Sequence, residues 1–133
     1  MREFIEKMRD EGLVIDVEVA VSADMQAPKM AAQTDKLLFF HKIEGSRAVM
    51  NLTASRRALS VALGIDEKKL VKTLADSKFD GKVKTSGTLT MKKPHLSSIP
   101  IMHHFPHDAG KYLTSGIVFA RFEGEENASI HRM

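Results

Sequence analysis

The last quarter of the chain, residues 99–133, carries the pattern that most constrains the fold. Two apolar runs, Ile117–Ala120 and Ala128–Ile130, flank the short polar link Glu123–Glu126, which contains one glycine. β-Forming residues on both sides of such a link are typical of a β-hairpin. A turn signal, Asp108–Tyr112, lies shortly before the first run. The pattern therefore predicts a rigid two-stranded ribbon that holds polar groups at defined places.

Helix and strand patterns follow one another upstream of this hairpin. Apolar residues at helical spacing predict helices over residues 1–11, over 55–63, and from Asp66 to Asp76. A further helix is predicted to end around Thr34; it begins either after Ser22, with a kink at Pro28, or near Gln26, with Pro28 in its first turn. Strand patterns fall at 13–20, 37–40, 47–51 and 88–91, with an extended piece at 100–105. Ser55 and Asp66 are suited to begin helices, and Gly12 and Gly64 to end them. The order predicts an α+β fold, with amino-terminal helices on a small mixed sheet.

Composition excludes several classes of function. The chain has 133 residues, which suits a modest core, and it has no cysteine, which excludes disulfides, thiolate metal sites and thiol catalysis. No apolar run is long enough to cross a bilayer and no signal-peptide pattern is present, so we expect a cytoplasmic protein with no membrane span. The net charge of +3 is mild, and one tyrosine with no tryptophan offers no base-stacking surface, so no nucleic-acid partner is expected.

Four short motifs of residues 99–133 resemble a known family. They are Ile99-Pro100-Ile101, then Asp108-Ala109-Gly110-Lys111-Tyr112, then Thr114-Ser115-Gly116, and finally Asn127-x-Ser129-Ile130-x-Arg132. In this order they resemble the prenylated-flavin-dependent decarboxylases of the UbiD type, which include 3-polyprenyl-4-hydroxybenzoate and ferulic acid decarboxylases. A weaker resemblance covers Asn51-Leu52, Arg57 and Ala62-Leu63-Gly64.

The resemblance implies a role for the last strand. It places Asn127 among the ligands of a divalent metal at the flavin phosphate, and Arg132 near the flavin ring in a Glu–Arg–Glu network. Arg132 is thus the catalytic candidate. The residues implied to bind the cofactor are Thr114, Ser115, Gly116, Asn127, Ser129, Ile130 and Arg132. An amide oxygen suits a hard cation, and a planar guanidinium suits a carboxylate.

The spacing of Asn127 and Arg132 permits one residue to contact the flavin phosphate and the other the flavin ring. Five steps along a strand cover about 16 Å at ~3.3 Å per residue, which is roughly the reach from a phosphate to a flavin ring. Odd and even positions of a flat strand face opposite sides, however. Asn127 and Arg132 therefore need a twist or a bulge between them to serve one ligand.

The resemblance also implies cofactors and partners. Prenylated FMN is expected, with a divalent metal, manganese, and potassium as a further ion. The substrate would be a small carboxylic acid, either aromatic or α,β-unsaturated, and the protein a homo-oligomer. The family's remaining metal ligands, a His and a Glu, and its catalytic Glu residues lie beyond the strand that carries Arg132. We therefore expect an amino-terminal portion that is inactive alone.

Other polar clusters have plainer interpretations. His103, His104 and His107 are interpreted as surface or turn histidines, because adjacent strand residues point to opposite faces and cannot easily share a metal. Asp108, before its turn, is expected to hydrogen-bond its own backbone. The basic pairs Lys92-Lys93 and Arg56-Arg57 could meet phosphate, but a solvated face is the commoner outcome.

Asp24, Asp35 and Asp66 show no pairing in the sequence that suggests general acid–base work. Two regions are expected: an amino-terminal α/β region over residues 1–98, and the start of a split-barrel-like flavin-binding region over 99–133. The favoured function is a portion of a prenyl-FMN-dependent carboxy-lyase. The alternative is a non-catalytic module, either for flavin or nucleotide binding or for subunit assembly. A third and weaker interpretation is a nucleic-acid binder that uses Lys82–Lys93.

Overall fold

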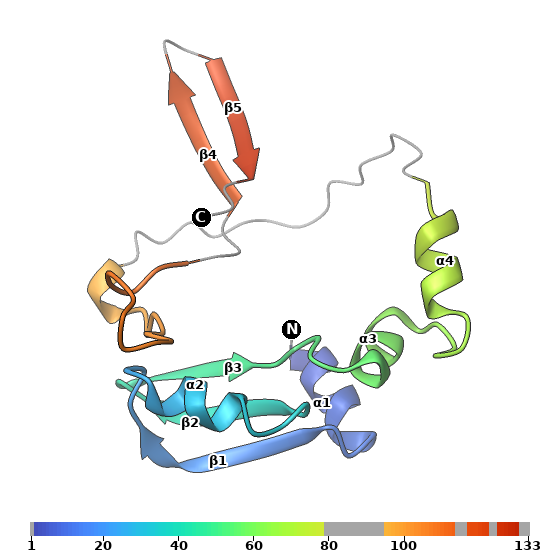
Figure 1. The fold of residues 1–133 in the computed structure, drawn as a ribbon, viewed down its shortest axis with the longest axis horizontal. Coiled ribbons are helices and arrows are strands. Elements are labelled where there is room, and N and C mark those ends of the chain that lie inside the picture. Colours follow the sequence, from blue (N-terminus) through green and yellow to red (C-terminus); the bar gives the residue numbers. More distant parts are fainter. Residues whose placement is uncertain (1, 79–94, 114–116, 123–124, 131–133) are drawn as a thin grey trace.

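A computed structural model describes residues 2–78, 95–113, 117–122 and 125–130 (Figure 1). Its helices are α1 (Arg2–Asp10), α2 (Gln26–Ala31), α3 (Arg56–Leu63), α4 (Leu70–Asp76) and the short 3-10 helix η1 (Leu96–Ser98). Its strands are β1 (Val14–Val21), β2 (Leu37–Ile43), β3 (Ser46–Met50), β4 (Ile117–Phe122) and β5 (Glu125–Ile130). The predicted α+β class is confirmed.

The first three strands form a mixed sheet with β2 in the centre. β1 pairs with β2 in parallel, and β3 pairs with β2 in the antiparallel sense across the turn at Glu44 and Gly45. The register between β1 and β2 shifts between Val17 and Ala20. Such a shift marks a bulge, which bends an edge strand and re-aims its side chains.

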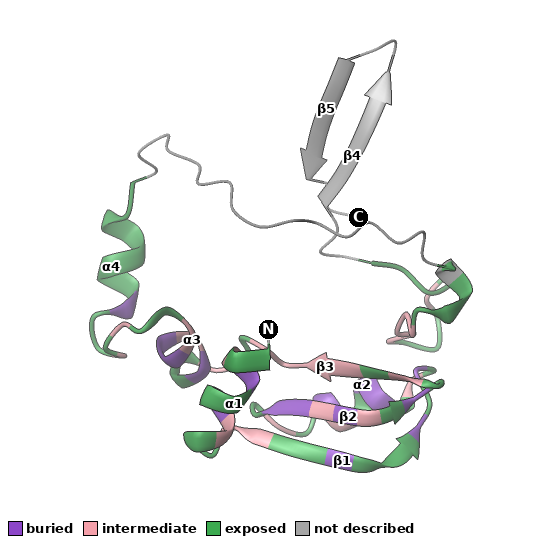
Figure 2. Ribbon diagram, turned by 180° about the vertical axis from the view of Figure 1, so that it is seen from behind, coloured by how far each residue is buried: buried purple, intermediate pink, exposed green. Residues whose placement is uncertain are grey.

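β2 is apolar at successive positions, so it presents apolar side chains on both of its faces. Helices pack against both faces. On one face, Leu38 and Phe40 pack in a cluster with Val17, Val21 and the alanines of α2. On the other face, Leu37 packs with Met8 of α1 and with residues of α3. Figure 2 shows buried segments on β2, α1, α2 and α3, so the core consists of two layers of helix on one sheet.

The helix ends follow local signals in most places. The Ser55 hydroxyl accepts a hydrogen bond from the Ala58 amide at 3.0 Å, as an N-cap should. Gly64 ends α3 with φ +67°, a left-handed conformation that favours glycine. The prediction for α4 was wrong at its start, which is Leu70 rather than the residue after Asp66. The Asp66 carboxylate instead accepts from the Lys68 amide at 2.9 Å, so it closes a separate turn before the helix.

The predicted carboxyl-terminal hairpin is confirmed, with longer strands than expected. β4 and β5 pair antiparallel from Ile117 opposite Ile130 to Phe122 opposite Glu125. Glu125 and Glu126, expected in the link, therefore belong to the strand. The strand predicted at 88–91 lies outside the described residues. No helix of the part that the structure describes is long and apolar enough to cross a membrane.

Candidate functional site

Strand β5 carries three of the residues that the sequence assigned to the cofactor. Asn127 lies opposite Ala120, Ser129 opposite Val118, and Ile130 opposite Ile117. Asn127 and Ser129 thus occupy alternate positions of one antiparallel ribbon. Whether these residues bind a cofactor stays a prediction.

The remaining assigned residues, Thr114, Ser115, Gly116 and Arg132, lie outside the described residues. The pairing of β5 with β4 has no register shift from Glu125 to Ile130. If a bulge brings Asn127 and Arg132 to one ligand, it therefore does not lie in that range.

The segment before the hairpin is attached to the first sheet through His103. The Met25 amide donates to the His103 carbonyl at 2.9 Å, and the His103 amide donates to the Ala23 carbonyl at 3.0 Å. The His103 ring Nδ1 lies 2.7 Å from an oxygen of Asp24. Of the extended piece predicted at 100–105, only His103 forms a β-bridge, with Asp24.

Two side-chain interpretations need correction here. His103 is not a surface or turn histidine: its side chain is only 21% exposed, and its Nε2 is buried without a hydrogen-bond partner among the described residues. Asp24 does have a pairing, with that same histidine. No local pattern signals this pairing, because the two residues are far apart in the chain.

Asp108 behaves as the sequence predicted. One of its carboxylate oxygens accepts from the Phe105 amide at 3.0 Å, and its own amide donates back to the Phe105 carbonyl at 3.1 Å. A hydrogen bond from the Tyr112 hydroxyl to Asp108 raises the pKa of that tyrosine above its ordinary value. Asp108 therefore orders the turn and Tyr112 after it.

Two neighbouring cavities, of about 400 and 620 Å³, lie where this segment meets the sheet, and Met50, Asn51 and His104 line both. Asn51 has a left-handed backbone with φ +61°. Its side-chain amide donates to the carbonyls of Ala31 and Thr34 at 2.8 and 2.9 Å. The Asn51 of the weaker family match thus joins the end of β3 to the end of α2.

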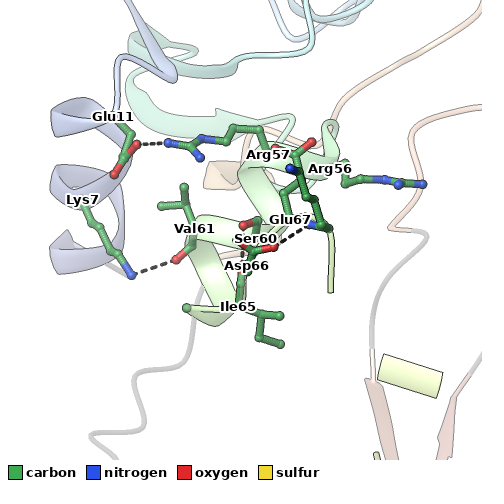
Figure 3. Close-up of a pocket in the computed structure, with 11 residues that line it drawn as sticks. Lys7, Glu11, Arg56, Arg57, Ser60, Val61, Ile65, Asp66 and Glu67 are labelled. Carbon is green, nitrogen blue, oxygen red and sulfur yellow. Dashed lines mark hydrogen bonds and ion pairs between the residues drawn. The ribbon is translucent and has the colours of Figure 1, made fainter. Parts of the chain in front are cut away.

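A pocket of about 660 Å³ lies between α1, α3 and the connection to α4 (Figure 3). Its polar groups are largely engaged within the fold. The Lys7 ammonium donates to the Val61 carbonyl at 2.8 Å, and the Arg57 guanidinium pairs with Glu11 at 2.5 Å. Arg56 is exposed and points away from that pair. Arg57 therefore connects α3 to α1, whereas a phosphate-binding role for the Arg56-Arg57 pair has no support in these contacts.

A polar cluster that sequence reasoning missed lies on the α1 side of the sheet. Asp16 lies on β1, and its two carboxylate oxygens accept from Arg9 of α1 at 2.6 and 3.1 Å. The His41 Nε2 on β2 lies 2.7 Å from Asp16 and 3.3 Å from Glu18. The hydrogen bond from Arg9, and then that from His41, lower the pKa of Asp16 to about 2. The i, i+2 spacing of Asp16 and Glu18 can be seen in the sequence. Their approach to His41 cannot, because it depends on the parallel pairing of β1 with β2, and His41 lies 25 residues after Asp16.

Two family models match successive parts of the chain. Residues 5–78 match the sequence model of the 3-octaprenyl-4-hydroxybenzoate carboxy-lyase N-terminal domain, UbiD_N. Residues 75–133 match the model of the Rift-related domain of the same carboxy-lyases, UbiD. The boundary expected at residue 98 stays a prediction.

Curated relatives include anhydromevalonate phosphate decarboxylases of archaea. The protein of Methanosarcina mazei is 34% identical over 99% of this chain and 32% of its own length. That of Archaeoglobus fulgidus is 38% identical over 68% of this chain and 22% of its own length. The chain thus spans a third or less of these two relatives.

Solved structures show the same fold. The UbiD-class enzyme HmfF from Pelotomaculum thermopropionicum, in an evolved dimeric form in complex with prFMN, is 21% identical, with a TM-score of 0.72 over 98% of this chain and 34% of that one. HmfF in complex with FMN gives a TM-score of 0.71 at 23% identity over 98% of this chain and 33% of that one. Two domain models match the chain in succession, and the first covers more than half of the chain. The chain therefore belongs to the UbiD carboxy-lyase family.

Proposed function

We propose that the chain is the amino-terminal portion of a prenylated-FMN-dependent decarboxylase. One observation carries this proposal: the two UbiD domain models match in succession and together cover residues 5–133. The relatives named as decarboxylases support the same reaction class. The reaction is a non-oxidative loss of CO2 from a carboxylic acid.

The cofactor would lie along β5. Asn127 would supply one ligand of a metal site, because an amide oxygen is a hard donor. Its position in the paired strand β5 supports this assignment. A divalent ion such as Mn²⁺ needs several further oxygen or nitrogen ligands, and potassium would be a second ion of the same site. When bound, prenylated FMN supplies the electron sink for the loss of CO2.

The chain's own residues would bind and orient. Arg132 would hold a carboxylate through the planar fork of its guanidinium. The residues proposed to line the cofactor are Thr114, Ser115, Gly116, Asn127, Ser129, Ile130 and Arg132.

The substrate class is an aromatic or α,β-unsaturated acid. The relatives' name makes anhydromevalonate phosphate the first acid to test. We further propose a homo-oligomer, a state consistent with the dimeric form of HmfF.

The test uses the full product of the gene. Its intact mass is measured, its bound cofactor is identified by mass spectrometry and metal analysis, and CO2 release is followed with anhydromevalonate phosphate and with an unsaturated aromatic acid. Prenylated FMN, manganese and turnover of one acid are expected. If neither flavin nor turnover is found after reconstitution with both cofactors, the proposal fails and the non-catalytic module is favoured.

A variant tests the assignment of Asn127. Replacing Asn127 by Ala removes the amide oxygen proposed to bind the metal. We expect manganese affinity to fall about tenfold or more, because even the loss of a residue that only orients a metal ligand has an effect of this size. Glu126→Gln, the neighbouring position of β5, is the control and should retain the metal. Equal manganese affinity of the Asn127→Ala and parent proteins would show that Asn127 is not a ligand.

A further inference from the structure

We propose that Asp16, Glu18 and His41 form a second metal site, suited to a divalent transition metal such as Zn²⁺ and separate from the flavin strand. One ligand atom from each residue lies within 4.8 Å of the other two. Two oxygen donors and one imidazole nitrogen form a set that zinc accepts, and three protein ligands leave a fourth position for water. The ion would join the edge strand β1 to the central strand β2.

The sheet itself brings the three side chains together. Asp16 pairs with Phe39 in the parallel register, so it shares a face with His41, two residues further along β2. Glu18 lies at the shift between Val17 and Ala20, where β1 bends. A bulge next to a group of polar side chains commonly re-aims one of them. Here Glu18 is turned toward the imidazole.

The distances suit an inserted ion after a small adjustment. Bonds of about 2.0–2.2 Å to nitrogen and oxygen, at a tetrahedral angle, place two ligand atoms about 3.4 Å apart. The His41 Nε2 lies 3.3 Å from the Glu18 oxygen, which is already near that separation. It lies 2.7 Å from Asp16, so this contact must open by a few tenths of an ångström or more. A rotation of the His41 ring, which is 30% exposed, can provide that movement.

Neighbouring residues hold the ligands and balance the charge. Arg9 holds both oxygens of Asp16, pairs with Glu6 at 2.6 Å, and lies 5.2 Å above the Phe39 ring. Phe39 meets the His41 ring edge-on at 4.6 Å between centroids. The carboxylates of Glu6, Asp16 and Glu18 and the guanidinium of Arg9 together leave two negative charges around the site. A divalent cation would neutralise them. Arg9 acts as the outer partner that orients a ligating carboxylate.

The test is a metal titration of the 133-residue chain, first stripped with a chelator and carrying no affinity tag. Zn²⁺ binding is measured by calorimetry, and Co²⁺ is added as a spectroscopic probe of coordination. We expect one equivalent of Zn²⁺, a visible Co²⁺ absorption of tetrahedral type, and a rise in melting temperature. His41→Ala should weaken Zn²⁺ binding about tenfold or more. A parent chain that binds no Zn²⁺ would overturn the proposal.

Two further variants guard against misreading a folding defect. Glu18→Gln changes a side chain that is 72% exposed, so the fold should persist while Zn²⁺ affinity falls. His103→Ala removes the second histidine that contacts an aspartate among the described residues, and it should leave Zn²⁺ affinity unchanged. Unchanged affinity in Glu18→Gln, or a loss confined to His103→Ala, would contradict the assignment.

Discussion

At the residue scale, Asp16 shows how one carboxylate can be fixed by contacts that only the fold creates. Its partners are Arg9 on a helix and His41 on a neighbouring strand. No local pattern in the sequence announces either contact, and the same is true of Asp24 and His103. Sequence reasoning found residues that act through their own backbone, such as Asp108, because those interactions are local. It missed side-chain pairs whose approach depends on strand pairing.

Asp16 should make folding stability depend on acid pH. Its pKa is about 2 in the folded chain against 3.8 ordinarily, so it stabilises the folded state above about pH 4, and this stability is lost as pH falls toward 2. A shift of that size has a ceiling of about 2.5 kcal/mol. Because the side chain is 35% exposed, screening reduces the expected effect to about 1 kcal/mol.

The measurement is urea unfolding of the parent chain and Asp16→Asn, with a chelator present, at pH 7 and at pH 2.5. The difference between the two proteins should be clear at pH 7 and should shrink at pH 2.5. Asp35→Asn, at an exposed carboxylate with no hydrogen-bond partner among the described residues, is the control. A difference that stays constant across pH would show that Asp16 is not a charged partner of Arg9.

Gly64 gives a second test at this scale. Its φ of +67° lies where a side chain is strained, although a Cβ there would meet no atom within 4 Å. Gly64→Ala should therefore lower the free energy of unfolding by about 1 kcal/mol through backbone strain alone. Gly110→Ala is the matched control, since that site is equally open and its φ lies outside the strained range. Equal effects of the two substitutions in urea unfolding would contradict the argument.

At the scale of elements, the sequence predicted most helices and strands of the described part, because their signals are local. Ser55 and Gly64 fix the ends of α3, and the apolar runs fix β2 and β4. The parallel pairing of β1 with β2, and its bulge, have no such signal. The start of α4 was misjudged for a related reason: Asp66 can cap a helix or close a turn, and the sequence does not distinguish the two.

The central position of β2 predicts which apolar residue the fold depends on most. Phe40 is fully buried and packs with residues of both β1 and α2. Phe40→Ala should cost about 3–5 kcal/mol of unfolding free energy, because it leaves a cavity between the helix and the sheet. Phe105→Ala, at a side chain 66% exposed, should change stability by no more than about 0.5 kcal/mol. Similar midpoints for the two variants would show that the α2 layer is not a packed core.

At the scale of the whole molecule, the family and the class of fold could be predicted, since ordered motifs and local patterns carry both. The site could be predicted only as a set of positions on a strand. Asn127 has its paired place in β5, whereas the pairing of Arg132 with a carboxylate stays a prediction. A flavin site requires groups from many segments, and this chain spans about a third of the length of the Methanosarcina mazei relative and of HmfF.

A chain that spans about a third of such an enzyme should bind the cofactor weakly. The 133-residue chain alone should fold but should retain little prenylated FMN, because the proposed ligand Asn127 would supply only one of the roughly six ligands that the metal requires. Flavin retained after gel filtration should therefore be far lower for this chain than for the full gene product, and CO2 release should be absent. Circular dichroism of the isolated chain, with the destabilised Phe40→Ala variant as the comparison, checks that the chain is folded. A missing flavin is then not attributed to unfolding. Stoichiometric flavin on the isolated chain would mean that residues 1–133 already contain the complete cofactor site.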